Sequence, residues 1–372
     1  MKKRLFVIIF ILFSSFLSNA QPKNEITVLY LLPFHLKESF DYTISIKGSA
    51  EINQIRQFEM MGFWLGTKMA LKEYENSNKK INVIVRDAVT DKKALNSILN
   101  DKNLMDSVKL IIGPLYGSLF PIVAEFAKNN CITIVNPFST RSDFVENNPY
   151  VYKIVPPFSS RPKALVDTFL SHLEEYTITI CRDSTITQEV LAYRYYFNEH
   201  KIPFKETNTL NVDQSSSKRN LIIALFDRPE RVIHWVHTLI NREEELEKIP
   251  DFVLIVPERW IYMSELTDDF FNLPNLYYFT NYFVNENSAV VKEFQYEYLY
   301  NYEAPAMLND YSYQGYDITR YFIDLFFADF DFTKVAFTPL SYQFLWKQIA
   351  EGGIENTKVR LIYVHNLELY ER

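Results

Sequence analysis

The stretch between residues 108 and 140 constrains the fold of this chain more than any other. An apolar run ends in Gly113-Pro114, a helical pattern follows over 119–128, and a second apolar run over 132–135 leads into Asn136-Pro137. Short apolar runs that alternate with a helix are typical of buried parallel strands. In an open parallel sheet, ligands bind at the carboxyl ends of strands, where small residues and helix starts expose backbone N–H groups. The two loops that follow these strands are therefore the first candidates for a binding site.

The same alternation of apolar runs and helical patterns extends along most of the chain, and it predicts parallel sheets with right-handed crossovers. Strands are predicted at 26–32, 81–87, 108–112, 132–135, 150–155, 177–181, 204–209, 221–226, 252–256, 276–279, 359–364 and 367–370. Helices are predicted at 58–75, 92–104, 119–128, 162–174, 188–200, 230–242, 289–302, 311–327 and 338–349. Only a polar turn over 211–220 separates two of these strands, so we expect one helix of the regular series to be missing there.

The first twenty residues have the composition of an export signal. Lys2, Lys3 and Arg4 precede an apolar core over 5–16, and Ser18-Asn19-Ala20 is a small-residue cleavage site. The apolar core is shorter than the ~20 residues needed to span a bilayer. No Cys follows Ala20, so a lipid anchor is not indicated. We therefore expect cleavage after Ala20 and a periplasmic product.

Net charge and cysteine content further restrict the class of protein to which this chain could belong. The chain carries a net charge of −7, and removal of the three positive charges of the signal lowers it to −10. Without a basic stripe, this balance argues against nucleic acid as a partner. Cys131 and Cys181 both fall in apolar runs, in different halves of the chain, so buried free thiols are expected rather than a disulfide.

The length of the chain indicates two lobes. About 350 residues remain after removal of the signal, which exceeds what a single hydrophobic core supports. Three prolines over 147–158 surround the extended run 150–155, a pattern that favours a crossing between lobes.

Five short motifs, in this order and spacing, resemble the type I periplasmic binding-protein superfamily, which includes the branched-chain amino acid binding proteins. The motifs are Val28-Leu29-Tyr30-Leu31-Leu32-Pro33, Gly62-Phe63-Trp64-Leu65-Gly66, Ile112-Gly113-Pro114 with Ser118, Asn136-Pro137-Phe138-Ser139-Thr140 and Tyr313-Gln314-Gly315-Tyr316-Asp317. Within the superfamily, the sequence is most similar to exported members from Bacteroidetes-type bacteria.

The resemblance implies an α/β fold of two lobes. Each lobe would be a mostly parallel sheet flanked by helices, with three crossings between the lobes and ligand enclosed by hinge closure. We expect residues 21–140 and 278–335 in lobe one, and 141–277 and 336–372 in lobe two.

The resemblance also implies a set of ligand-binding residues. Amino acid binders of the family hold the ligand carboxylate at two places: a Ser after the strand that ends in Gly-Pro, and a turn containing a small residue and a Thr after the next strand. The ligand ammonium binds the acid of a Pro-Glu pair in lobe two. The corresponding positions and their neighbours are Tyr116, Gly117, Ser118, Phe138, Ser139, Thr140, Asp227, Glu258 and Trp260. Phe138 is bulky where the family prefers Ala or Ser, Asp227 replaces an aromatic, and Arg259-Trp260 follow Glu258 where small residues are usual.

Each of these residues also has a purely structural interpretation. Ser118, Ser139 and Thr140 are residue types that cap helices and turns. Glu258 at a strand end needs a partner if it is buried, and the neighbouring Arg259 could supply it. The aromatic side chains predicted at strand ends and crossings are explained by packing as well as by stacking on a ligand. They are Tyr116, Phe138, Tyr150, Trp260 and Tyr282.

Catalytic signatures are missing from the sequence. It contains no Gly-x-Ser-x-Gly elbow, no phosphate-binding loop, no His-Glu-x-x-His and no Cys-x-x-Cys. His234 and His237 lie three apart on a predicted helix but have no obvious third ligand. We therefore expect neither an enzyme nor a bound cofactor or metal.

Two functional hypotheses remain. The first is a solute-binding protein that captures a small polar ligand, similar to an amino acid, a peptide or a sugar, and delivers it to an inner-membrane permease of an ABC transporter. The second is a cell-envelope scaffold or regulator of the penicillin-binding-protein-activator type, which this chain also resembles in fold. Its partner would be a protein of the envelope. A monomer or weak dimer is expected in both cases.

Overall fold

The structure is a computed structural model, and it describes most of the chain. The described residues are 24–36, 58, 60–88, 91–208, 218–226, 231, 233–234, 252–266, 268–273, 275–308 and 311–372. The export signal predicted for residues 1–20 lies outside them, as does Asp227. Among the described residues, no helix is long and apolar enough to cross a membrane.

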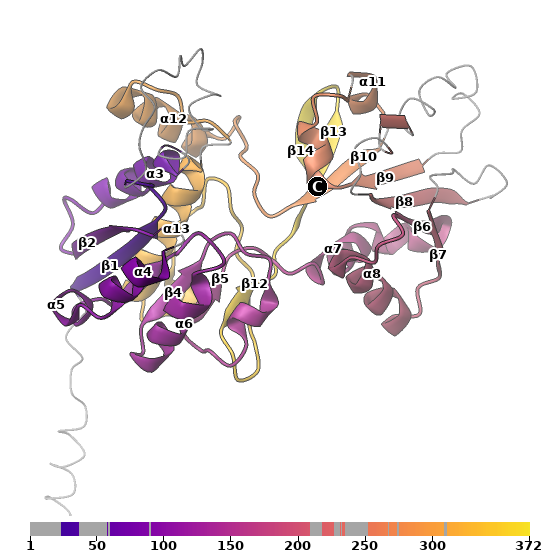
Figure 1. Cartoon of the computed structure of the whole chain (residues 1–372). Helices are drawn as coiled ribbons and strands as arrows, with labels where there is room; N and C mark the ends of the chain where they lie inside the picture. Colours follow the sequence, from indigo (N-terminus) through magenta and orange to yellow (C-terminus); the bar gives the residue numbers. More distant parts are fainter. Residues whose placement is uncertain are drawn as a thin grey trace, which may run out of the picture. The chain divides into compact units, whose positions relative to one another are not determined.

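The first of two seven-stranded sheets has the order β11-β12-β5-β4-β3-β1-β2 (Figure 1). Its strands are β1 (Glu25–Leu32), β2 (Lys80–Asp87), β3 (Leu110–Ile112), β4 (Thr133–Asn136), β5 (Val151–Lys153), β11 (Trp346–Gln348) and β12 (Ile354–Asn356). The pairings of β1 with β2 and β3, of β4 with β5 and of β5 with β12 are parallel, and β11 runs antiparallel to β12. Seven of the eight residues of β1 are buried, as expected for a central strand covered on both faces.

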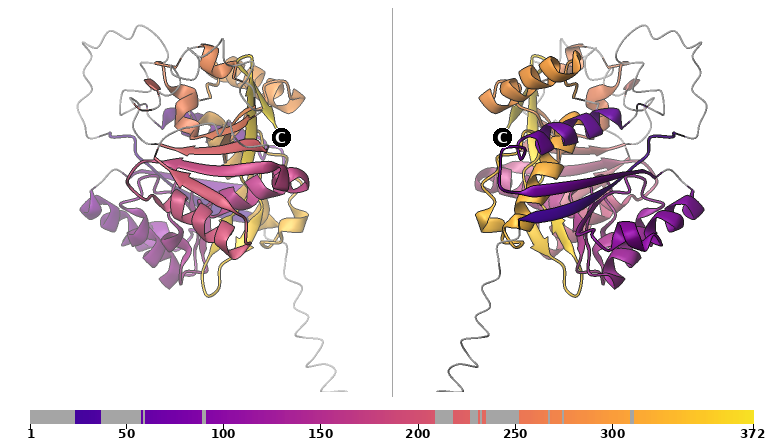
Figure 2. Two further views of the ribbon diagram at one scale, coloured as in Figure 1. Left: turned by 90° about the vertical axis from the view of Figure 1, so that its right-hand side faces the viewer. Right: turned by 90° about the vertical axis from the view of Figure 1, so that its left-hand side faces the viewer.

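Helices cover both faces of this sheet (Figures 1 and 2). The helices of this part of the chain are α3 (Met61–Lys72), α4 (Lys92–Leu99), α5 (Lys102–Met105), α6 (Phe120–Asn129), α12 (Ala289–Tyr302), which contacts α3, and α13 (Ser312–Phe327), with 3-10 turns η1 (Ser142–Val145) and η4 (Phe332–Lys334). The last two long helices come from far along the sequence, and α13 packs directly on α3.

The second sheet has the order β14-β13-β10-β9-β8-β6-β7. Its strands are β6 (Tyr176–Arg182), β7 (Phe204–Thr207), β8 (Arg219–Leu225), β9 (Phe252–Val256), β10 (Leu276–Thr280), β13 (Arg360–His365) and β14 (Glu368–Glu371). Its helical segments are α7 (Ser160–Phe169), η2 (Leu170–Glu175), α8 (Gln188–Glu199), η3 (Glu258–Tyr262) and α11 (Asp268–Phe271). β6 to β10 pair in parallel, whereas β13 is antiparallel to β10 and to β14.

The chain passes between the two sheets three times: between β5 and β6, between β10 and β11, and between β12 and β13. Two mostly parallel sheets with three connecting passages are the predicted fold class. The chain divides into two compact units, Met1–Ile112 with Phe294–Pro339 and Gly113–Glu293 with Leu340–Arg372.

Two glycines bring α3 and α13 into close approach. A Cβ atom on Gly66 would lie 1.8 Å from the carbonyl oxygen of Ser312, and one on Gly315 would lie 2.0 Å from that of Phe63. Only glycine avoids these clashes without moving a helix. Both glycines belong to the motifs that carry the family resemblance, so the structure gives these positions a packing reason.

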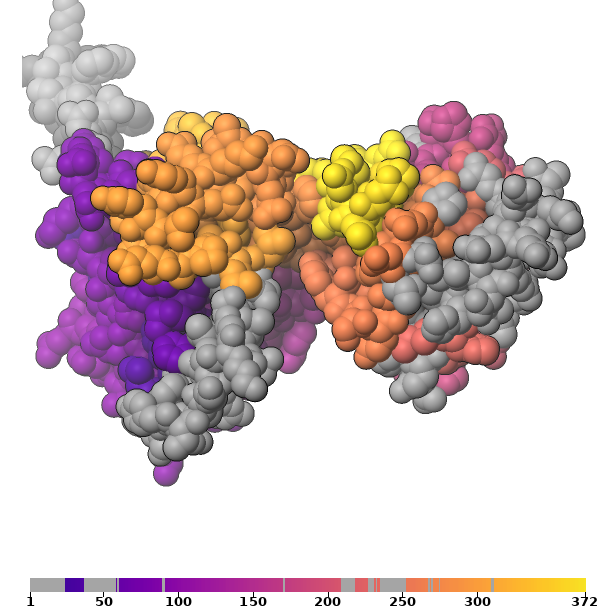
Figure 3. All heavy atoms as spheres, turned by 90° about the horizontal axis from the view of Figure 1, so that it is seen from above, coloured from indigo at the N-terminus to yellow at the C-terminus, as the bar shows by residue number. Residues whose placement is uncertain are grey.

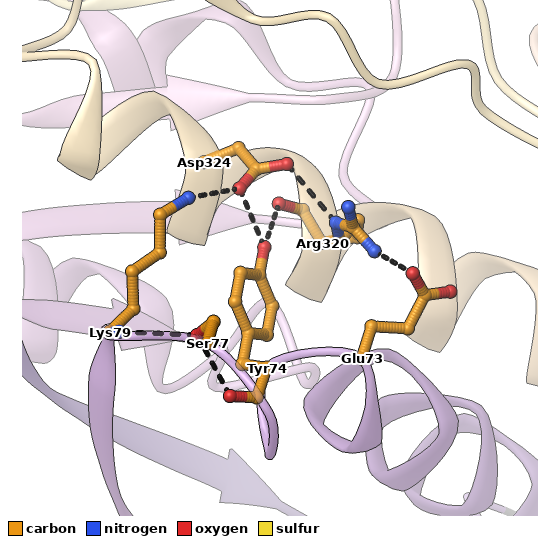
Figure 4. Close-up of polar contacts among 6 residues, drawn as sticks. All are labelled: Glu73, Tyr74, Ser77, Lys79, Arg320 and Asp324. Atoms are coloured by element: carbon orange, nitrogen blue, oxygen red, sulfur yellow. Dashed lines mark hydrogen bonds and ion pairs between the residues drawn. The ribbon is translucent and has the colours of Figure 1, made fainter.

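A set of charged side chains ties the end of α3 to α13 (Figure 4). The hydroxyl of Tyr74 donates to Asp324 Oδ1 at 2.8 Å, and Lys79 Nζ lies 3.1 Å from the same oxygen. Arg320 reaches Asp324 Oδ2 at 3.1 Å and also pairs with Glu73. Each charge in this cluster therefore has an opposite partner, which is typical of a structural ion-pair network.

A similar set of ion pairs, around Glu206, connects the edge strand β7 to neighbouring elements. Arg182 Nε lies 2.8 Å and Arg194 Nη2 2.6 Å from Glu206 Oε2, and Arg194 Nε binds the other carboxylate oxygen. Hydrogen bonds from Arg194 and Arg182 hold the pKa of Glu206 down to about 2. Arg182 lies on β6 and Arg194 on α8, so one carboxylate connects three elements.

Because the pKa of Glu206 is lower in the folded chain than in the unfolded one, its contribution to stability is present above about pH 4.3 and is lost as pH falls toward 2. We expect a loss of about 1 to 2 kcal/mol over this interval, since the partly exposed pair is weakened by solvent. Glu206→Gln should remove this part of the pH dependence. Urea denaturation at pH 7, 4 and 2.5 measures it, and parallel pH curves for the two proteins would contradict it.

The predicted strands are confirmed within the described residues, with ends displaced by two residues or fewer. The helix predicted at 338–349 is wrong, because β11 forms there and pairs with β12. Cys131 and Cys181 are free, as expected, but Cys131 is exposed rather than buried. The helix expected to be missing at 211–220 falls largely outside the described residues.

Candidate functional site

The loop after β3 carries the first group of predicted ligand-binding residues. It begins at Gly113, whose φ of 96° requires glycine, and leads into α6. Tyr116 is half-buried, whereas Gly117 and Ser118 are exposed. The N-cap of α6 is Leu119, and no side chain caps this helix. The capping role considered for Ser118 is therefore not what the structure has.

The loop after β4 carries the second group. The side chain of Asn136 accepts a hydrogen bond from Ser139 N at 2.8 Å, and Ser139 Oγ accepts one from Arg141 N at 3.1 Å. The turn interpretation of Ser139 is therefore correct, while its hydroxyl proton stays available to a further acceptor. Phe138 is half-buried, and Thr140 is exposed.

Thr140 also lines a cavity of about 610 Å³. The other lining residues come from the start of η1, from the segment that precedes α7 and from α8: Arg141, Ser142, Asp143, Pro157, Phe158, Ser159, Gln188, Leu191, Ala192, Tyr195 and Tyr196. Aromatic rings and hydroxyl groups thus surround this position. Of the predicted ligand-binding residues, Thr140 lines this cavity.

Glu258, the predicted partner of a ligand cation, begins η3 directly after β9. Thr280 Oγ1, at the end of the neighbouring strand β10, donates to Glu258 Oε1 at 2.7 Å. Burial raises the pKa of Glu258, while the hydrogen bond from Thr280 and the charge of Arg161 oppose this shift. Glu258 is therefore half-buried at the carboxyl edge of the second sheet.

Arg161 is a functional candidate that the sequence analysis missed. It lies at the start of α7, and its Nη1 is 2.5 Å from Glu189 Oε1 at the start of α8. Its charge also acts on Glu258. One arginine thus serves two acids, so the group keeps a net charge of −1. Nothing in the sequence Ser160-Arg161-Pro162 signals this role, because the two acids come from distant elements.

Trp260 is placed in the core of the second sheet. It is 1% exposed and packs in a cluster with Phe270, whose ring centroid is 6.3 Å away. Arg259, which the sequence suggested as a partner for Glu258, donates to the carbonyl of Phe226. Asp227 lies outside the described residues. The described residues include no group of three or more His, Cys, Asp or Glu that could hold a metal.

Comparison with known proteins identifies the fold. A branched-chain amino acid ABC transporter protein from Rhodospirillum rubrum aligns over 94% of this chain and 100% of its own, with a TM-score of 0.65 at 12% identity. An ABC transporter substrate-binding protein from Desulfitobacterium hafniense aligns over the same shares, with a TM-score of 0.56 at 13% identity. LpoA from Haemophilus influenzae aligns over 95% of this chain and 60% of its own, with a TM-score of 0.58 at 14% identity.

No family model and no curated protein sequence matches the chain. The structural matches nevertheless agree on one architecture. The chain has the two-lobed fold of the type I periplasmic binding proteins, as the sequence motifs predicted. The Bacteroidetes-type origin stays a prediction.

Proposed function

We propose that the protein is a non-catalytic, exported binding protein that captures a small polar solute between its two lobes. The fold supports this proposal, because its structural neighbours include proteins described as ABC transporter substrate-binding proteins. One of them is described in complex with Leu. Delivery to an inner-membrane permease, a periplasmic location and a monomeric or weakly dimeric state belong to the same proposal.

The observation that carries the proposal is the environment of Glu258. Glu258 is half-buried after a strand, and a carboxylate withdrawn from water is costly unless it has partners. Here Thr280 donates one hydrogen bond, and Arg161 is shared with Glu189. The remaining net negative charge favours a ligand that brings a cationic or hydrogen-bond donor group to Glu258.

The loops of the first sheet supply complementary groups. Gly117 and Ser118 are exposed before the start of α6, and the Ser139 hydroxyl and Thr140 follow β4. Such groups suit the anionic or carbonyl end of a small polar molecule. Tyr116 and Phe138 would contact its apolar part.

The lobe boundaries are part of the proposal as well. Sheet membership favours a division within each late segment, since β11 and β12 belong to the first sheet and β13 and β14 to the second. β10 likewise belongs to the second sheet. We propose that the passages between the sheets, rather than residues 278 and 336, mark the division between the lobes.

A scaffold or regulator of the cell envelope is the second candidate. The LpoA match favours it. In this case Arg161 is the cation that interacts with Glu258, and no cationic solute is needed at this position. A flat ligand screen and capture of an envelope protein by the chain would support this alternative.

The test is a thermal-unfolding screen of amino acids, beginning with L-leucine, and of short peptides and sugars. A ligand at 100 times its Kd should stabilise the protein by about 2.7 kcal/mol. Glu258→Gln and Ser118→Ala should each weaken its binding by about 1 to 3 kcal/mol.

Glu265→Gln and Ser107→Ala serve as controls, because both side chains are exposed and neither is a predicted ligand-binding residue. They should leave the affinity unchanged. If an identified ligand binds equally well to all four variants, the site assignment is wrong.

A further inference from the structure

A cavity of about 530 Å³ lies among α7, the hairpin of β11 and β12, and the C-terminal strands. None of the predicted ligand-binding residues lines it. Its lining residues are Pro157, Ser159, Ser160, Lys163, Ala164, Asp167, Thr168, Leu345, Lys347, Glu355, Thr357, Lys358, Val359, Arg360, Leu361, Glu371 and Arg372. The last residues of the chain, yellow in Figure 3, are exposed at the surface.

Basic side chains outnumber acidic ones in this lining by five to three. Two of the acids are already neutralised, because Asp167 pairs with Lys163 at 2.5 Å and Glu371 with Arg360 at 2.5 Å. Within the described part of the chain, Lys347 and Lys358 have no acid at ion-pair distance. The cavity is therefore positive in a chain whose net charge is −7.

The start of α7 adds to this positive character. Ser159 and Ser160 line the cavity, and the helix that begins there is ten residues long. The helix dipole favours negative charge at this end, whereas Ser160 N and Arg161 N already donate to the carbonyls of Pro157 and Phe158, and Pro162 has no N–H.

Glu355 supplies an independent sign of a ligand. It is 6% exposed, it lines the cavity, and its Oε2 has no hydrogen-bond partner among the described residues. Lys153 Nζ forms an ion pair with this oxygen at 3.6 Å, beyond hydrogen-bond distance, and donates a hydrogen bond to the carbonyl of Val155 at 2.5 Å. A buried acceptor without a donor is unfavourable, so a ligand that donates here would be stabilised.

We propose that this cavity binds a small organic anion that also carries a hydroxyl or amino group. The anionic groups would contact Lys347 and Lys358, and the donor would bind Glu355 Oε2. A simple anion such as phosphate satisfies the basic groups but leaves Glu355 without a donor. This second site is independent of the solute site at Glu258.

Citrate and tricarballylate test the proposal, because they carry the same three carboxylates and only citrate has a hydroxyl group. Isothermal titration of the full chain in metal-free buffer should show millimolar or tighter binding of citrate and weaker binding of tricarballylate. The Lys347→Ala/Lys358→Ala double variant should lose about tenfold in citrate affinity, as expected for two partly exposed ionic contacts. Glu355→Gln should reduce the preference for citrate over tricarballylate.

The control is Lys92→Ala/Lys93→Ala, which removes two exposed lysines from α4 and should leave citrate binding unchanged. Glu258→Gln should also leave it unchanged, which separates this site from the proposed solute site. Absence of citrate binding, equal binding by both lysine double variants, or equal affinity for the two anions would each overturn the proposal. The comparison of the two anions on the unaltered chain holds even if Glu355→Gln folds poorly.

Discussion

Replacing Gly315 with alanine is expected to lower the free energy of unfolding by about 3 kcal/mol, with a similar loss for Gly66→Ala. The added Cβ would lie 2.0 Å from Phe63 O in the first variant and 1.8 Å from Ser312 O in the second. The obstacle is backbone in both cases, so no side-chain rotation relieves it, and α3 and α13 must move apart. Helix propensity alone predicts the opposite sign, a gain of about 1 kcal/mol for alanine over glycine.

Gly117→Ala is the matched control, because no atom lies within 4 Å of the Cβ it adds and Gly117 is exposed. We expect its free energy of unfolding to stay within about 0.5 kcal/mol of the unaltered protein. Urea denaturation followed by circular dichroism measures all three variants. If Gly315→Ala is as stable as Gly117→Ala, the close approach of the two helices is not what stabilises this unit.

The two glycines show which part of the helix packing the sequence could predict and which part it could not. Gly66 and Gly315 were recognisable as parts of family motifs, but their physical role depends on a contact between helices separated by some 250 residues of sequence. Local periodicity predicts that both segments are helical and which side is apolar. It does not show which helix packs on which, or how closely.

The segment 338–349 shows where local patterns fail. Its side chains are apolar enough for a helix, yet its last residues form β11, which pairs with β12. Asn356 holds this arrangement, because its side chain accepts from Leu345 N at 2.8 Å and donates to Gln343 O at 3.0 Å. A hairpin of this kind depends on a partner strand and on one buried amide, neither of which appears as a periodic signal.

The candidate site likewise contains residues that the sequence could predict and residues that it could not. The loops after β3 and β4 and the acid after β9 were predictable, since parallel strands place their following residues at one edge. Arg161 was not, because its relation to Glu189 and Glu258 is set by how the starts of two helices meet that edge. Trp260 follows Glu258 by two residues, but it turns into the core.

Arg360→Met is expected to cost about 2 to 4 kcal/mol, because loss of the buried guanidinium leaves two carbonyl groups and the partly exposed carboxylate of Glu371 without a donor. The guanidinium is 7% exposed, binds Glu371 through Nε at 2.8 Å and Nη2 at 2.5 Å, and donates from Nη1 to the carbonyls of Phe283 at 2.9 Å and Ser341 at 2.8 Å. Methionine keeps much of the volume but leaves a carboxylate and two carbonyl groups without these donors. Urea denaturation gives the change in the free energy of unfolding.

Arg141→Met is the matched control for burial. Arg141 binds Asp143 with the same two-point geometry, at 3.0 and 2.5 Å, but the two side chains are 62% and 52% exposed. We expect its loss to cost at most about 1 kcal/mol. Equal losses for Arg141→Met and Arg360→Met would contradict the argument from burial.

Arg360 contacts segments that connect the two sheets. It follows the third passage between the sheets, while Phe283 and Ser341 lie near the two ends of the second passage. One guanidinium therefore joins two of the three segments at which a two-lobed binding protein would bend. An Arg360→Met/Glu371→Gln double variant should regain part of the lost stability, since the carboxylate no longer lacks its cation, but it should not restore the bonds to the two carbonyls. If the double variant recovers fully, the ion pair alone stabilises this region and the two passages are not joined through Arg360.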